Sequence, residues 1–160
     1  MKPTKLQIRN NAASLLSDLL NDEQNVDKVL IVKSASPEIK SLIKLIAATA
    51  AAHNRELDQM ATNDPTLRLD ATDLPPGETA TRDATAKTQE HALLFSTGVN
   101  FEFNLLYCQA EAQNYGRELA GVAAKNCERP EEATRFEAIS KSMEHLNDEV
   151  LSTMRSLPPD

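Results

Sequence analysis

Apolar residues recur at helical spacing along almost the whole chain. This pattern predicts four helices, over residues 5–34, 37–61, 80–126 and 130–156. Strand-like alternation of β-branched residues is absent from the sequence, so we expect an all-α fold. Since 160 residues can enclose one substantial core, we expect a single domain over residues 1–160.

The third predicted helix is the most apolar segment and should lie at the centre of the fold. Five of the six aromatic residues lie between residues 92 and 124, and they point to several sides of the helix. A helix of this kind needs neighbours on most sides. We expect Phe95, Val99 and Leu106 to be almost fully buried, and Gly98 to mark the place where so long a helix can bend.

The connections between the helices follow from capping and turn residues. Ser36 and Pro37 are suited to cap and open the second helix directly after the first, which favours an antiparallel hairpin. Weak helix formers at 21–25 make a break in the first helix possible. Residues 63–77 form a long linker with several proline residues, which can cross the bundle or fold as a side loop.

Several polar residues fall on apolar helix faces, where a carboxylate is costly unless it is paired or bound to a cation. Glu23, His53 and Glu102 are the principal ones, and together they form a candidate site for a divalent metal such as Fe, Mn or Zn. The alternative is a structural role: pairing at a helix seam for Glu23 and Glu102, and a hydrogen-bonded position in the core or at the bundle end for His53. Gln109 and Gln113 are expected to point inward as well.

Motifs of known catalytic chemistry are missing from the sequence. It has no glycine-rich phosphate loop, no Cys-x-x-Cys, no His-Glu-x-x-His and no Gly-x-Ser-x-Gly. None of the glutamates is followed three residues later by histidine, so the standard di-iron centre of carboxylate bundles is not expected. His145 lies opposite the apolar face of its helix and should face water.

Some of these residues carry a resemblance to a known family. The order of four helices, with Ser-Pro-Glu-Ile-Lys at 36–40 and His53 near the end of the second helix, resembles a ferritin-like bundle of exported bacterial proteins of unknown function. Phe101-Glu102 is similar to that family's Phe-Asp pattern, Glu23 to an acidic position, and His145-Leu146 to a closing His-Leu. The resemblance implies a ferritin-like, largely antiparallel four-helix bundle with a long third helix, and a role in metal binding or stress.

The sequence also departs from that family. Gln113 stands where the family has a histidine in its third helix, and His53 fits the second-helix histidine only with an offset of one turn. The signal or lipoprotein segment typical of the family is missing.

Charge and composition narrow the class of partner. A net charge of −7 argues against a nucleic-acid surface. No apolar run approaches the roughly 20 residues needed to span a membrane. Cys108 and Cys127 are expected to be free thiols, which favours a cytoplasmic location, or a periplasmic one if a signal segment has been trimmed.

Three functions are compatible with these patterns. The first is a non-catalytic interaction or structural protein, expected to be a homodimer, because Phe103 and Tyr107 form a second apolar face beside the core stripe. The second is a metal-binding bundle, and the third is a carrier of a small apolar ligand between the helices. The first and the third of these functions need no cofactor.

Overall fold

The computed structural model describes residues 1–159, and this part of the chain contains helices and no strand. The helices are α1 (Lys5–Glu23), the 3-10 helix η1 (Val26–Lys28), α2 (Val29–Val32), α3 (Pro37–Asn63), α4 (Pro76–Phe95), α5 (Gly98–Lys125) and α6 (Pro130–Arg155). The all-α prediction is therefore confirmed.

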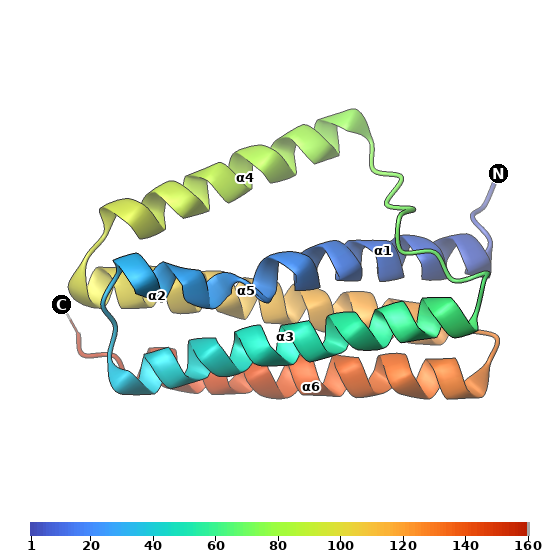
Figure 1. Ribbon diagram of the computed structural model, residues 1–160. Helices are drawn as coiled ribbons and strands as arrows, with labels where there is room; N and C mark the ends of the chain where they lie inside the picture. The colour runs from blue at the N-terminus through green and yellow to red at the C-terminus, as the bar shows by residue number, and fades with distance from the viewer. Residues whose placement is uncertain (160) are drawn as a thin grey trace.

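Helices α1, α3, α5 and α6 form a bundle, and α2 prolongs α1 (Figure 1). Helix α1 packs against α3 and α5, and α6 packs against the same two helices. Each neighbouring pair is antiparallel (Figure 1). Helices α3 and α5 run in the same direction because the linker and α4 lead the chain back along the bundle between them.

Local chemistry defines where the bundle helices begin and end. Thr4 and Gln7 form a capping box at the start of α1, in which each side chain accepts from the other residue's backbone N–H. Ser36 accepts from the backbone N–H of Ile39, and Pro37 occupies the first turn of α3, as the sequence predicted. The first predicted helix breaks after Glu23, within the stretch of weak helix formers.

The prediction of one continuous helix over residues 80–126 is wrong. The structure has two helices here. Helix α4 begins at Pro76, the helical conformation is interrupted at Ser96 and Thr97, and α5 begins at Gly98, whose φ is +60°. That left-handed conformation suits glycine and turns the chain sharply rather than bending one helix. Helix α4 diverges from the bundle toward its N-terminal end, and none of its described residues is buried (Figure 1).

The break explains an error in the predicted burial. Phe95 is 76 % exposed, because the helical phase of α5 does not continue through the break into α4. Val99 is half-buried, and Leu106 is fully buried as predicted. Phe101 and Leu105 complete the buried aromatic and aliphatic face of α5 near its start.

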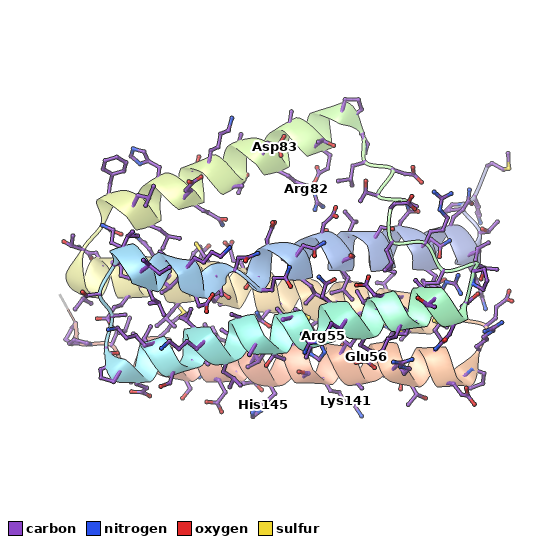
Figure 2. All side chains as sticks on the ribbon, in the orientation of Figure 1. Arg55, Glu56, Arg82, Asp83, Lys141 and His145 are labelled. Carbon is purple, nitrogen blue, oxygen red and sulfur yellow. The ribbon has the colours of Figure 1, made fainter. Side chains whose placement is uncertain are left out.

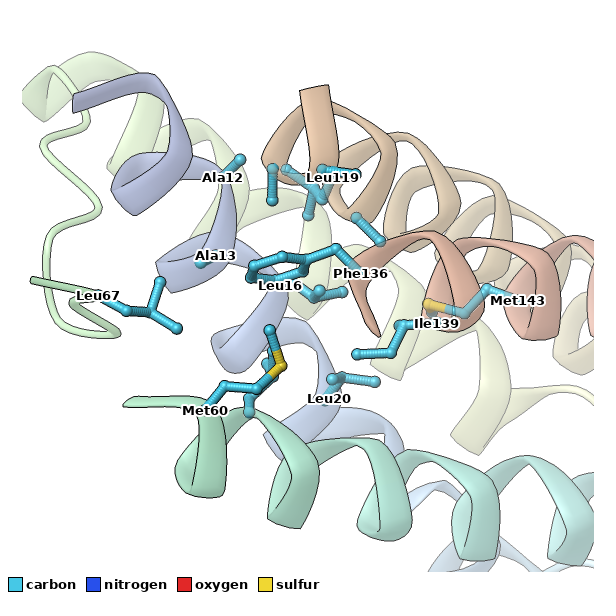
Figure 3. Packing of buried hydrophobic residues seen from close by; sticks show 14 of the residues in the cluster. Ala12, Ala13, Leu16, Leu20, Met60, Leu67, Leu119, Phe136, Ile139 and Met143 are labelled. Carbon is cyan, nitrogen blue, oxygen red and sulfur yellow. The ribbon is translucent and has the colours of Figure 1, made fainter. Parts of the chain in front are cut away.

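The bundle core consists of two apolar clusters. One surrounds Phe136 and Met143 with residues of α1, α3 and the end of α5 (Figure 3). The other joins the start of α3, the start of α5 and the end of α6 around Phe101 and Leu106. Between them α1 and α5 contribute three buried polar side chains, which we call the polar layer: Glu23, Gln109 and Gln113.

Candidate functional site: a cleft beneath helix α4

A cleft of about 940 Å³ lies where α4 diverges from the bundle. Its walls come from the end of α1, η1, α2, α4 and the middle of α5 from Leu105 to Tyr115. The walls are largely apolar and include Leu19, Val26, Val29, Val32, Ala86, Leu93, Leu94, Leu105, Ala112 and Tyr115. This size and lining match those of sites for small organic ligands, which are mostly apolar with a few polar groups.

The polar layer forms the base of the cleft. Glu23 and Gln109 both line it, although the two side chains are only 8 % and 3 % exposed. Glu23 Oε2 and Gln109 Oε1 have no hydrogen-bond partner among the described residues. Gln113 Oε1, one turn further along α5, is unpartnered too. Buried acceptors left without a donor cost free energy, which a ligand in the cleft, water or the proton of neutral Glu23 can offset.

The surroundings of Glu23 favour its neutral form. Burial and, to a smaller extent, the neighbouring Asp22 charge raise the pKa of its carboxyl group, which reaches about 7 overall. A hydrogen bond with the Gln109 side chain works in the opposite direction and lowers the pKa. The carboxyl group can therefore change its charge near neutral pH, at the bottom of an otherwise apolar cleft.

Most of the charged residues around the cleft are acidic. Asp22, Glu90 and Glu111 line it together with Glu23, and Lys28 is the basic residue among the described lining. This imbalance makes the local electrostatic potential negative. The potential attracts cations and repels anionic ligands.

Toward its N-terminal half, α4 is connected to the bundle by one polar contact. Arg82 points from α4 toward the bundle, where its Nη2 donates to the Tyr115 hydroxyl at 2.9 Å (Figure 2). The guanidinium group also lies 5.3 Å from the centroid of the Tyr115 ring. Within α4, Glu78 accepts from Arg82 Nε at 2.8 Å. This contact limits how far α4 can move away from the cleft.

The structure does not bring the three predicted metal ligands together. Glu102 Oε2 accepts from the backbone N–H of Ser36 at 3.1 Å, at the start of α3. His53 Nε2 lies 2.9 Å from Ser142 Oγ of α6, and burial lowers the pKa of its imidazole. Along α3, position 53 is about 24 Å from the start of the helix at 1.5 Å per residue. A single ion therefore cannot contact Glu102 and His53 at once.

Glu23 lies in the polar layer with Gln109, whereas Glu102 and His53 contact Ser36 and Ser142. No group of three or more His, Cys, Asp or Glu residues suited to a metal ion occurs in the part of the chain that the structure describes. The predicted inward positions of Gln109 and Gln113 are confirmed, as is the exposure of His145 (Figure 2).

A second buried polar cluster lies at the far end of the bundle. Arg9 of α1 contacts Asp64 of the linker at 3.2 Å and Glu132 of α6 at 3.1 Å, and all three are buried. Burial alone would raise the pKa of Asp64, but hydrogen bonds from Thr66 and the Arg9 charge lower it to about 2. Burial raises the pKa of Glu132. With every charge close to a partner, this cluster is a structural clamp rather than an open site.

The sequence offered a carrier with a pocket between the helices as one of three functions, but it located neither the cleft beneath α4 nor this clamp. It placed residues 80–95 within a continuous helix, so no space was expected beneath them. Ser96-Thr97-Gly98 was the available signal, because two residues with poor helix propensity precede a glycine. The clamp joins residues 55 and 123 positions apart, and no local pattern reports such contacts.

Comparisons with protein-family models, with curated proteins and with solved structures found no match to this chain. In the described residues, no helix combines the length and the hydropathy required to cross a bilayer.

Proposed function

We propose that this protein is a non-catalytic binding protein that holds a small, largely apolar ligand in the cleft between α4 and the bundle. The observation that carries the proposal is the pairing of apolar walls with two unpartnered buried acceptors, on Glu23 and Gln109, at the base. Apolar walls supply affinity through burial, and a few polar groups fix the orientation of the ligand.

This function agrees with the placement of the other candidate residues. Glu102 and His53 have protein partners that account for their positions, so neither is available to a ligand in the cleft. A structural or interaction role alone would leave the cost of the unpartnered carboxyl group unexplained. Ligand binding offers a reason for that cost.

The bundle order supports a ferritin-like arrangement as part of the proposal. One long connection, made of residues 64–75 and α4, separates two helical hairpins, and ferritin-like bundles also have one long crossover. In this protein the crossover contains a helix that covers the cleft. We propose that the bundle provides the scaffold and that α4 acts as the outer wall of the binding site.

A fluorescence titration with the neutral apolar dye N-phenyl-1-naphthylamine tests the proposal. Wild type should bind the dye saturably. Ala86→Trp places an indole ring in the cleft from α4. Because the ring and the dye cannot occupy the same volume, the affinity for the dye should fall by about tenfold or more. Ala84→Trp is the matched control: it makes the same change two positions earlier, at an exposed residue outside the cleft lining.

The two variants separate cleft binding from adsorption on exposed apolar side chains. Dye binding that survives in Ala84→Trp and is lost in Ala86→Trp supports the cleft. An absence of saturable binding to wild type, or equal binding by the two variants, would overturn the proposed function.

A further inference from the structure

The base of the cleft lacks hydrogen-bond donors rather than acceptors. Glu23 Oε2 and Gln109 Oε1 are both acceptor atoms, both unpartnered, and both on side chains more than nine-tenths buried. They come from different helices, α1 and α5, and line the same cleft. A ligand that satisfies them must bring N–H or O–H groups to this end of the cleft.

The negative potential of the cleft limits the chemistry of that donor. Four carboxylates line the cleft against one lysine, so a positively charged head group is attracted and a phosphate or carboxylate is repelled. A bare divalent ion is a poor fit, because hard cations require about six oxygen ligands and the base offers a carboxylate and an amide. The apolar walls would contribute nothing to the binding of such an ion.

Organic cations differ in the N–H donors that they offer. A quaternary ammonium group has no N–H donor and is typically bound by several aromatic faces. Among the described lining residues Tyr115 is the aromatic one, and its ring already faces Arg82. A primary ammonium group has three N–H donors, and it can donate to the Glu23 carboxylate and the Gln109 carbonyl at the same time.

The geometry points to a primary amine with an apolar body as the ligand of this cleft, its ammonium group held by Glu23 and Gln109 and its hydrocarbon part by the walls from α2, α4 and α5. This inference rests on the proposed function and specifies its ligand class. In the complex Glu23 is ionised, so its charge and that of the amine neutralise each other within the apolar surroundings.

Displacement of N-phenyl-1-naphthylamine by octylamine and by octanol tests the inference, because the two compounds share a tail and differ in the head group. Wild type should bind octylamine more tightly than octanol by about tenfold or more, as expected for a charge-assisted hydrogen bond replacing a neutral one. Glu23→Gln should abolish this preference and leave octanol binding unchanged. Glu137→Gln, at an exposed carboxylate outside the cleft lining, should keep the preference.

Dye binding by Glu23→Gln shows that the variant has kept a folded cleft. The inference is overturned if wild type does not prefer octylamine, or if Glu23→Gln retains that preference. In either case, displacement by octanol leaves the proposed function in place. If neither compound displaces the dye, the inference fails, whereas dye binding by Ala86→Trp and Ala84→Trp decides the proposed function separately.

Discussion

Glu23 lies at a position where an ionised carboxyl group is costly. The side chain is 8 % exposed, one of its oxygens has no partner among the described residues, and Asp22 adds a like charge beside it. The sequence predicted its inward orientation from helical phase, and this is confirmed. Its predicted partners, His53 and Glu102, lie elsewhere, because helical phase gives the face of a residue and not its neighbours on another helix.

The pH dependence of stability should report the state of Glu23. Its pKa rises from 4.5 to about 7 on folding, so the folded state holds its proton more tightly than the unfolded state. The carboxyl group therefore stabilises the fold below about pH 4.5, and this contribution is lost as pH rises through about 7. The lost contribution is roughly 3 kcal/mol for a shift of this size.

Urea melts of wild type and Glu23→Gln at several pH values between 4 and 8 measure this effect. The stability of wild type should fall relative to the variant across this range. The difference between the two free energies of unfolding reports Glu23, because the other titratable groups around the cleft are present in both proteins. Those groups include Asp22, Lys28, Glu90, Cys108 and Glu111. If the free energies of unfolding of the two proteins change with pH in parallel, the ionisation of Glu23 does not destabilise the fold.

At the scale of elements, the clamp around Arg9 holds three segments in place. It joins the start of α1 to the linker and to the first turn of α6. Because all three groups are buried, removing Arg9 leaves both Asp64 and Glu132 without their cation. Surface ion pairs behave differently, since water solvates each charge when its partner is lost.

We predict that Arg9→Met lowers the free energy of unfolding by about 3–5 kcal/mol, because Asp64 and Glu132 then remain buried without their cation. Arg68→Met is the matched control, since Arg68 and Asp70 form an exposed pair, and it should cost less than about 1 kcal/mol. Chemical denaturation gives both values. Equal losses for the two variants would show that the clamp does not stabilise the bundle.

The sequence predicted elements best where one helical period continues without interruption. The helical spacing predicts apolar stripes from Ile39 to Met60 on α3 and from Phe136 to Met154 on α6, and all of their residues are buried except Met154, which is half-buried. The same reasoning failed at residues 80–95, because it carried the phase of α5 through Ser96 and Thr97. The polar character of α4 was visible in the sequence, but its angle to the bundle depends on contacts such as Arg82 with Tyr115.

At the scale of the whole molecule, an exposed aromatic pair remains outside both the core and the cleft. Phe103 and Tyr107 lie one turn apart on α5, with ring centroids 6.3 Å apart, and each is about half exposed. Phe95 and Ile31 are also exposed large apolar side chains. Homodimer formation through Phe103 and Tyr107 stays a prediction, because a two-fold interface would pair this surface with itself.

Sedimentation velocity at micromolar concentration tests the homodimer. Wild type should sediment as a dimer, and Phe103→Glu should shift the population toward monomer, since two like charges would meet near the two-fold axis. Ala84→Trp, on another face, should leave the dimer unchanged. A monomeric wild type would exclude this interface at that concentration.

The most direct measurement of the proposed site is a titration of ¹⁵N-labelled protein with octylamine, followed by amide chemical shifts. Saturable changes should be largest around the cleft, at Val29, Leu93 and the side-chain amide of Gln109, and small at Phe103 and Tyr107. Changes confined to the exposed apolar residues, or changes that do not saturate, would contradict binding in the cleft beneath α4.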